Sequence, residues 1–365
     1  SNYAISYING SLTIAPAALT ITALDQTKTY GESLNFSGTE FSSAGLVNDE
    51  SISSVSLNSQ GTLATAAVNG SVPYVIEASN VVGGETFDVG NYAIRYINGA
   101  LTVQPASLII TALDQTKTYG DSLSFSGSEF SAVGLVNSET LTSVALSSTG
   151  AVATAAVNNG LPYSIQASDV VGGATFDVGN YSINYINGSL MIAPAALTIT
   201  ALDQSKTYGD SINFSGTEFS SVGLVNDESI ASVSLNSLGA PATAAVNNGL
   251  PYTIQASNVI GGETFDAGNY SINYINGSLT VRPASLIITA LDQTKTYGES
   301  INFSGSEFSS VGLVNDESIT SVSLNSLGTL ATASVNNGLP YTIQASDVIG
   351  GETFDVGNYA IKYIN

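Results

Sequence analysis

The chain of 365 residues carries 29 acidic and 7 basic side chains, for a formal net charge of −22, and it contains neither histidine nor cysteine. These counts exclude disulfides, histidine metal sites, and Ser–His–Asp or Cys–His catalysis. So acidic a surface repels nucleic acid and anionic lipid, and no apolar run is long enough to span a membrane. We therefore expect no nucleic-acid partner and no membrane span in this segment.

One sequence unit of 89 residues is repeated four times along the chain. The motif Lys-Thr-Tyr-Gly returns every 89 residues, with its tyrosine at Tyr30, Tyr119, Tyr208 and Tyr297. The motif Gly-Asn-Tyr returns at the same interval, with its tyrosine at Tyr92, Tyr181, Tyr270 and Tyr359. Solenoid units have periods of roughly 20–50 residues, so this longer period favours a string of small domains.

Short proline linkers mark the expected boundaries, at Pro16, Pro105, Pro194 and Pro283. They give the tail of a preceding repeat at residues 1–15 and four repeats at residues 16–104, 105–193, 194–282 and 283–365. The fourth repeat lacks the last strand of the others, so we interpret the chain as a window from a longer array. Because proline fixes φ and restricts its predecessor, the joints are expected to be stiff and the array an elongated rod.

Within repeat 1, period-two alternation and β-branched residues predict strands. In chain order they are Leu19–Leu24, Ser33–Phe36, Val55–Leu57, Ala64–Val68, Tyr74–Ala78, Tyr92–Tyr96 and Leu101–Val103. Asn98-Gly99, between the last two, is typical of a tight hairpin. The segment Phe41–Ser51 does not alternate, and we expect either a loop or a short helical turn capped by Asn48.

The fold class predicted from these patterns is mostly β. Each repeat is expected to be sandwich-like, or a β-rich two-layer α+β unit with at most one short helix. Every tyrosine and phenylalanine outside the leading tail falls in a slot shared by all four repeats. We interpret these rings as filling a separate core in each domain, with Phe36, Tyr92, Ile94 and Leu101 among the buried residues. The alternative is that exposed tyrosines form a surface on which sugars stack.

Charged side chains offer few candidate sites. Calcium requires six to eight converging oxygens, and no EF-hand spacing is present. The candidate calcium ligands are the acids near the domain joints, Asp25, Asp114, Asp203 and Asp292. The other acids are interpreted as solvated. Lys28 and its equivalents are expected to pair with Asp25 or Glu32, with an isopeptide cross-link as the alternative. We predict no catalytic residues, no enzyme activity, and no cofactor other than calcium.

Several motifs together resemble one family of repeats. They are Lys-Thr-Tyr-Gly after the first strand, Gly-Leu-Val-Asn at 45–48, and the closing phrase Asn-Tyr-x-Ile-x-Tyr-Ile-Asn-Gly-x-Leu-Thr. In this order and spacing they resemble the MBG repeat (mostly-β, glycine-rich) of the YGX type. The resemblance covers nearly the whole chain. It implies large secreted bacterial surface proteins that are adhesin-like or filamentous-haemagglutinin-like, and it supplies no catalytic residues.

Our leading hypothesis is a structural repeat region, the stalk or fibre shaft of an extracellular bacterial adhesin or matrix protein. One alternative is a self-assembling filament, in which Asn2–Ile14 of one chain completes repeat 4 of another by strand addition. Another is a multivalent module whose repeats bind surface glycans or proteins weakly and gain by avidity. The expected partners are neighbouring repeats and possible surface ligands, and the expected location is the bacterial cell surface or secreted matrix.

Overall fold

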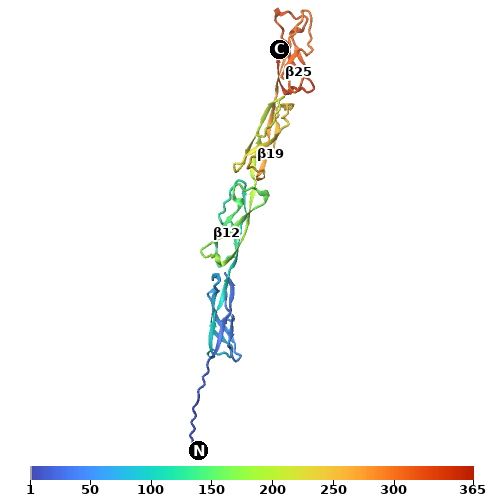
Figure 1. Ribbon diagram of the computed structural model, residues 1–365. Helices are drawn as coiled ribbons and strands as arrows, with labels where there is room; N and C mark the ends of the chain where they lie inside the picture. Colours follow the sequence, from blue (N-terminus) through green and yellow to red (C-terminus); the bar gives the residue numbers. More distant parts are fainter. Residues whose placement is uncertain (1) are drawn as a thin grey trace. The chain divides into compact units, whose positions relative to one another are not determined.

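The computed structural model describes residues 2–365, and in Figure 1 each repeat folds within its own band of colour. The chain forms two compact units. Unit 1 runs to Lys117 and also contains Ser122–Val152 and Leu161–Met191. Unit 2 contains Ile192–Asn365 together with two loops of repeat 2, Thr118–Asp121 and Ala153–Gly160. Those loops belong to unit 2 because they pack against repeat 3.

Repeat 1 consists of strands in two sheets. Its strands are β1 (Ala17–Ala23), β2 (Gln26–Thr29), β3 (Phe41–Ala44), β4 (Ile52–Asn58), β5 (Tyr74–Gly83), β6 (Tyr92–Ile97) and β7 (Gly99–Gln104). One sheet has the order β3-β1-β6 and the other the order β2-β7-β5-β4. The pairs β1–β6 and β2–β7 are parallel, and the remaining pairs are antiparallel. The predicted mostly-β class with four domains in tandem is confirmed.

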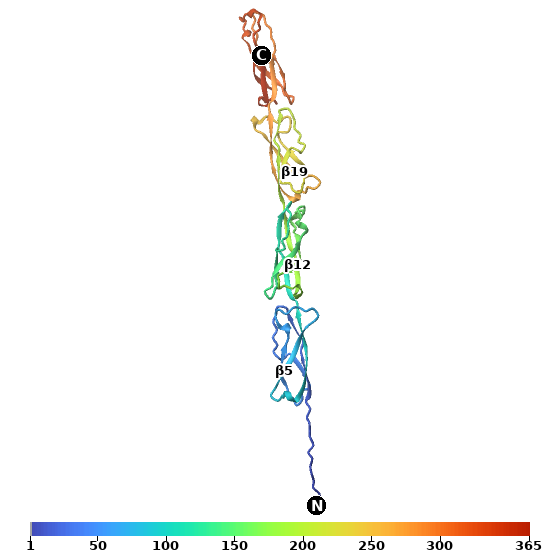
Figure 2. The same ribbon diagram turned by 90° about the vertical axis from the view of Figure 1, so that its left-hand side faces the viewer.

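Repeats 2 and 3 follow the same plan. Repeat 2 has β8 (Ala106–Ala112), β9 (Gln115–Thr118), β10 (Phe130–Val133), β11 (Leu141–Ser147), β12 (Tyr163–Gly172), β13 (Tyr181–Ile186) and β14 (Gly188–Ala193). Repeat 3 has β15 (Ala195–Ala201), β16 (Gln204–Thr207), β17 (Phe219–Val222), β18 (Ile230–Asn236), β19 (Tyr252–Gly261), β20 (Tyr270–Ile275) and β21 (Gly277–Arg282). Figure 2 labels β5, β12 and β19, which hold the same place in repeats 1, 2 and 3.

Repeat 4 has fewer strands, and the helices throughout are single 3₁₀ turns. Repeat 4 has β22 (Ala284–Ala290), β23 (Phe308–Val311), β24 (Ile319–Asn325), β25 (Gln344–Gly350) and β26 (Tyr359–Ile364). The 3₁₀ turns are η1 (Gln60–Thr62), η2 (Val89–Asn91), η3 (Thr149–Ala151), η4 (Asn158–Gly160), η5 (Val178–Asn180), η6 (Asn247–Gly249), η7 (Ala267–Asn269), η8 (Leu327–Thr329), η9 (Asn336–Gly338) and η10 (Val356–Asn358). Within residues 2–365, no helix is long and apolar enough to cross a membrane.

The core of each repeat lies between its two sheets. Strand β1 alternates as its sequence predicts, with Leu19, Ile21 and Ala23 buried and the intervening residues facing outward. From the opposite sheet Ile76 and Leu101 meet them, and neither has any exposed surface. Of the residues predicted to be buried, Tyr92 and Leu101 are buried, whereas Phe36 and Ile94 are half-buried.

Three local predictions are wrong, and one strand was not predicted. Ser33–Phe36 and Ala64–Val68 form no strands, although they run close to other chain segments through bonds such as Leu34 N–H to Thr62 O, 2.9 Å. The segment Phe41–Ser51 is neither a loop throughout nor helical, because Phe41–Ala44 pairs with β1 as strand β3. Strand β2 was not anticipated, since its sequence QTKT has no apolar residue to mark it.

The prediction of a tight hairpin at Asn98-Gly99 is also wrong. Strands β6 and β7 belong to different sheets, so Asn98 carries the chain from one layer to the other. Gly99 is not among the glycines with positive φ. It is required for a different reason: a Cβ there would lie 2.7 Å from the main-chain oxygen of Ala23. The glycine therefore permits close approach to β1 and does not form a turn.

Residues 2–16 form no strand, and all of their side chains are exposed. Leu12 is 89% exposed and Ile14 is 87% exposed. These positions correspond to Leu101 and Val103 of β7, which are 0% and 5% exposed. The tail predicted at residues 1–15 is thus extended chain without a sheet to join, and Ser1 lies outside the described residues.

Candidate functional site

The recurrent feature with the most buried polar chemistry is the joint between successive repeats. At each joint a tyrosine just after the second strand of one repeat meets a glutamate and a tyrosine of the next. These triads are Tyr30–Glu139–Tyr181, Tyr119–Glu228–Tyr270 and Tyr208–Glu317–Tyr359. Each triad lies within one of the two compact units.

In the first joint both tyrosines donate to one carboxylate. The Tyr30 hydroxyl donates to Glu139 Oε1, and the Tyr181 hydroxyl donates to Glu139 Oε2 over 2.7 Å. The Tyr181 oxygen also accepts from the main-chain N–H of Val136 at 3.2 Å. The two rings meet edge to face, with centroids 5.6 Å apart and planes at 80°. The buried carboxylate therefore receives hydrogen bonds from two directions, as a buried charge requires.

Two asparagines close the rim of the same joint. Asn180 is buried, and its Oδ1 accepts from the main-chain N–H of Val68 at 2.8 Å. Asn137 has a left-handed backbone with φ at 53°, and its Nδ2 donates to Ala64 O at 3.2 Å. Main-chain groups of one repeat's loop are thus bound by side chains of the next. These bonds orient the joint as well as holding it together.

A glycine at each joint allows one repeat to approach a valine side chain of the next repeat closely. Gly31, the glycine of Lys-Thr-Tyr-Gly, has φ of +91°, and a Cβ there would lie 2.7 Å from the Cβ of Val136 in the next repeat. Gly120 and Gly209 stand in the same relation to Val225 and Val314, again at 2.7 Å. The joint therefore explains the Tyr-Gly pair of the Lys-Thr-Tyr-Gly motif. The tyrosine provides the hydroxyl that binds the glutamate, and the glycine has no side chain to clash with the valine.

The other two joints reproduce this geometry. Tyr270 and Tyr359 donate to their glutamates at 2.7 and 2.6 Å, with edge-to-face ring pairs at 5.5 and 5.6 Å. Asn269 accepts from Val157 N–H at 2.9 Å, and Asn358 accepts from Val246 N–H at 2.8 Å. One arrangement is therefore built three times from the same residue types.

The hydrophobic cores continue through the joints. One cluster of buried residues joins Tyr30, Ala66 and Val103 of repeat 1 to Leu108 and Ile110 of repeat 2. Another cluster joins Tyr208, Val246 and Val281 of repeat 3 to the core of repeat 4. The expectation that aromatic residues fill a separate core in each domain is therefore wrong, because two of the four tyrosine slots serve the contact between neighbours.

Burial and hydrogen bonding raise the pKa of the joint tyrosines. Burial is the main cause for Tyr30, and the bond to Glu139 adds to it, since a phenol that donates to a carboxylate resists losing its proton. Burial raises the pKa of Tyr181 and of Tyr270 to about 12, again with a contribution from the glutamate. These hydroxyls remain donors through the neutral and mildly alkaline range.

In repeats 1 to 3 the predicted calcium ligands follow the first strand and bind the main chain at the start of the last strand. Asp25 Oδ1 accepts from Ala100 N–H at 2.7 Å, and Asp114 and Asp203 bind the matching N–H groups of Ser189 and Ser278. Among residues 2–365, no three His, Cys, Asp or Glu side chains gather as a metal-binding group. Calcium at Asp25, Asp114, Asp203 or Asp292 stays a prediction.

The lysine of the repeated motif binds main-chain carbonyls. Lys28 is buried, and its Nζ donates to Glu32 O at 2.8 Å and to Leu63 O at 2.5 Å. Burial lowers the pKa of Lys28, and the Glu32 charge partly offsets that effect. The expected pairing with Glu32 is thus through its main-chain oxygen. Lys206 binds the corresponding oxygens of Asp210 and Pro241.

A turn closed by a glutamate carboxylate was not predicted from the sequence. Glu129 accepts from the hydroxyl and N–H of Ser126 and from Gly127 N–H, which holds its pKa at about 2. Glu40, Glu218 and Glu307 occupy the same turn in the other repeats. The motif Ser-Gly-x-Glu is the sequence signal for this turn, and it corrects the interpretation of these acids as solvated.

Two solved structures of other proteins are weakly similar to this chain. The crystal structure of Drosophila N-cadherin EC1-4 is similar at 9% identity and a TM-score of 0.21, over 92% of this chain and 97% of that one. The Bacillus anthracis TIE protein is similar at 7% identity and a TM-score of 0.22, over 89% of this chain and 62% of that one. Neither similarity bears on what this chain does, and no curated protein matches it.

The MBG domain of the YGX type matches the chain four times, at residues 19–102, 108–191, 197–280 and 286–365. These matches fall within the four repeats and confirm the resemblance given by Lys-Thr-Tyr-Gly and the closing phrase. The chain therefore belongs to the MBG domain (YGX type) family and is a tandem array of four such domains.

Proposed function

We propose that these repeats form the stalk or fibre shaft of an extracellular bacterial adhesin or matrix protein, without catalytic activity. The observation that carries the proposal is the joint, built three times from the same tyrosine, glutamate and asparagine positions. A shaft must present its tip at a set distance, and it does so by repeating one domain and one joint.

The joint suits this role because it limits rotation between neighbours. A hinge with a single contact leaves rotation free, whereas two tyrosines on one carboxylate and two asparagines on loop main chain constrain several directions at once. The last strand of repeat 1 ends at Gln104, and the first strand of repeat 2 begins at Ala106, so only Pro105 separates them. Proline restricts the remaining freedom.

The placement of the aromatic side chains also supports a shaft over a binding surface. In repeats 1 to 3 the four tyrosines of every repeat are buried or half-buried. Their hydroxyls bind partners within the chain, as Tyr96 does in accepting from Val81 N–H at 3.1 Å. The acidic surface keeps such an array soluble and discourages sideways association.

Small-angle scattering tests the geometric role. The variant Glu139→Ala, Glu228→Ala and Glu317→Ala removes the carboxylate from the three joints. Glu50→Ala is the matched control, because Glu50 has the same place in repeat 1 and accepts from Tyr92 of its own repeat. We expect the parent chain and the control to share one narrow range of maximum dimensions. The triple variant should show a broader range. Equal profiles for all three would contradict the proposal. Antibody labelling of intact source cells tests the location separately.

A multivalent binding role is the second candidate, favoured by a surface hollow that recurs in repeats 1, 3 and 4. In repeat 1 it is lined by Asn58, Ser59, Gln60, Tyr74 and Glu77, with a volume of about 270 Å³. Amide, hydroxyl and carboxylate groups beside one aromatic edge are the chemistry that binds sugars. A glycan array probed with the whole chain, and with a variant that combines Glu77→Ala, Gln255→Ala and Gln344→Ala, should show binding that the variant loses. Absence of any bound glycan would remove this candidate.

A further inference from the structure

The face that repeat 1 offers to repeat 2 is made of two separate chain segments. One is the turn Tyr30–Glu32, which contains the tyrosine and glycine of the Lys-Thr-Tyr-Gly motif. The other is the loop Leu63–Val68, whose Ala64 oxygen and Val68 N–H are bound by side chains of repeat 2. Neither segment belongs to a strand, so the ladders of the sheets do not fix the distance between them.

The buried Lys28 ties these two segments together. Its Nζ donates to Glu32 O at 2.8 Å, at the end of the turn, and to Leu63 O at 2.5 Å, at the start of the loop. A main-chain bond from Gly31 N–H to Ala64 O, at 3.1 Å, links the same two segments. Lysine suits this task because its compact ammonium carries three donors, so it binds carbonyl oxygens that lie in different directions.

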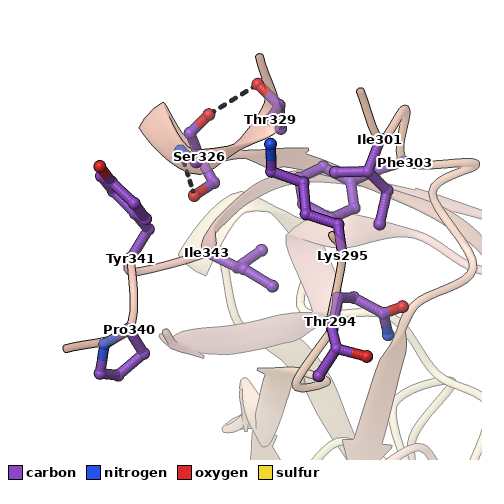
Figure 3. A pocket seen from close by; sticks show the side chains of 11 residues that line it. Thr294, Lys295, Ile301, Phe303, Ser326, Thr329, Pro340, Tyr341 and Ile343 are labelled. Carbon is purple, nitrogen blue, oxygen red and sulfur yellow. Dashed lines mark hydrogen bonds between the residues drawn. The ribbon is translucent and has the colours of Figure 1, made fainter. Parts of the chain in front are cut away.

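The same contact recurs in the other repeats. Each lysine of the motif donates to the main-chain oxygen 35 residues later, which belongs in turn to Leu63, Val152, Pro241 and Leu330. Lys28, Lys206 and Lys295 also donate to the main-chain oxygen four residues later. Figure 3 shows the ammonium end of Lys295 pointing toward Thr329, the residue before its acceptor. The acceptor's side chain changes between repeats, and the contact persists because it involves only the main chain.

This position is an expensive place for a positive charge. The chain has 7 basic residues against 29 acids, and four of the seven occupy it. Lys28, Lys117 and Lys206 are 6%, 9% and 8% exposed. Burying an ammonium costs free energy, and burial lowers the pKa of Lys28 and of Lys206. An apolar side chain of the same length would fill the space without this cost, so packing alone does not explain the lysine.

We propose that the buried lysine of Lys-Thr-Tyr-Gly is the positioning residue of the joint, because it holds the turn and the loop of one repeat at the spacing that the next repeat requires. In the first joint Lys28 acts through the Ala64 oxygen, which accepts from Asn137, and through Val68 N–H, which donates to Asn180. This inference rests on the shaft proposed above, since a positioned face matters only where the joint fixes the direction of the array.

Amide hydrogen exchange of the whole chain tests whether the lysine positions the loop. In Lys28→Met a neutral side chain of similar length replaces the ammonium. We expect the Val68 amide to exchange at least about tenfold faster, because the loop moves away from Asn180 and the bond between them is lost. The amides of strand β1 should keep their protection, because the core does not depend on the charge.

The third joint supplies the matched control. Val246 N–H donates to Asn358 there, and both lie in the other compact unit. Exchange of the Val246 amide should not change in Lys28→Met. In Lys206→Met the effects should be reversed, with faster exchange at Val246 and unchanged exchange at Val68. Equal changes at the two amides in either variant would contradict the proposal.

A chemical rescue separates the charge of the side chain from its shape. Because the chain has no cysteine, Lys28→Cys provides a single thiol, which is alkylated in the unfolded state before refolding. Bromoethylamine forms a thioether that ends in an ammonium at lysine length, and unbranched bromopropane forms the neutral thioether of the same shape. We expect the ammonium form to restore the exchange rate of the Val68 amide to within about threefold of the parent chain. The propyl form should behave like Lys28→Met.

Different results overturn the proposal in different ways. Equal protection of the Val68 amide in the ammonium and propyl forms would make the side chain a spacer whose charge has no role. Loss of protection along strand β1 in Lys28→Met would make the lysine part of the fold of repeat 1. Unchanged exchange at Val68 in Lys28→Met would remove any role in the joint. The shaft itself stands or falls separately, on the scattering of the glutamate variant.

Discussion

Repeats 3 and 4 have nearly the same sequence and different second sheets. Strand β16 pairs with β21 in repeat 3, whereas the equivalent segment Gln293–Thr296 forms no strand in repeat 4. Strand β19 begins at Tyr252, but β25 begins three residues later in the motif, at Gln344. The comparison teaches that these strands do not follow from their own residues. They form because the last strand of the repeat lies between them.

The absence of the last strand also exposes core residues of repeat 4. Ile254 is fully buried in repeat 3, and Ile343 in the same place of repeat 4 is half-buried. Lys206 is buried, while Lys295 is half-buried. The first sheet is unaffected, since β22 still pairs with β23 and β26 in the usual register. A repeat is therefore made of one sheet that forms without the last strand and one that depends on it.

Supplying the strand to repeat 4 should have the largest effect. Adding Gly-Ser-Leu-Thr-Val-Arg, copied from Gly277–Arg282, after Asn365 should bury one leucine, whereas the valine of this strand is buried in repeat 3 at the joint with repeat 4. We expect repeat 4 to gain about 3–6 kcal/mol from the buried leucine and from the hydrogen bonds of the restored strand pairs. Hydrogen exchange at Gln293–Thr296 measures the gain, and the same extension with aspartate in place of leucine is the control.

Removing the leucine from repeat 3 should make that repeat resemble repeat 4. Leu279→Ala is expected to cost about 2–5 kcal/mol, because it leaves a cavity at a fully buried site. Thr280→Ala, on the other face of β21, should cost little. Hydrogen exchange of β16 and β19 gives the measurement. Unchanged protection of both strands in Leu279→Ala would show that the ladder holds without its central side chain.

The joint tyrosines give a matched pair of single-atom changes. Tyr208→Phe removes the hydroxyl that donates to the buried Glu317, and we expect a loss of about 1–3 kcal/mol. Tyr297→Phe makes the same change where the side chain is 66% exposed, and it should be close to neutral in the monomer. Urea unfolding of the two variants measures the difference. Equal stabilities would mean that the hydroxyl contributes nothing to the joint.

Alkaline pH should open the joints without any mutation. A tyrosine whose pKa is raised by folding contributes stability that is complete below its ordinary pKa of 10.0 and is lost as pH rises through the folded value. For Tyr270 that value is about 12, so the contribution falls between pH 10 and about 12. Unfolding followed across this range should show the fall, and Tyr270→Phe should reduce it. A flat profile would contradict the prediction.

Sequence alone was enough for the repeat, the fold class and five of the strands of repeat 1, because burial alternates along them. It was insufficient for β2, whose side chains are polar and whose strand exists through its partner β7. The hairpin predicted at Asn98-Gly99 is wrong because a glycine is equally suited to a turn and to a close approach between main chains. Only the structure distinguishes the two, since a Cβ on Gly99 would lie 2.7 Å from the main-chain oxygen of Ala23.

The sequence did not predict the joint between repeats, for a related reason. Tyr30 and Tyr92 occupy similar slots in the repeat, and periodicity assigns both to a core. Their equivalents meet across a boundary, through residues 109 positions apart such as Tyr30 and Glu139. No local pattern marks a contact at that separation. The recurrence of Glu50, Glu139, Glu228 and Glu317 at one position was the available signal, and it pointed equally well to solvated acid.

The two parallel strand pairs have a mechanical consequence. Tension along the chain enters repeat 3 at Ala195, the start of β15, and leaves at Arg282, the end of β21. Strand β20 continues into β21, so β15 and β20 are pulled in opposite senses along their shared length. Their ladder has six residue pairs, and the β16–β21 ladder has four. Both are loaded in shear, so their hydrogen bonds resist together and do not open one at a time from an end.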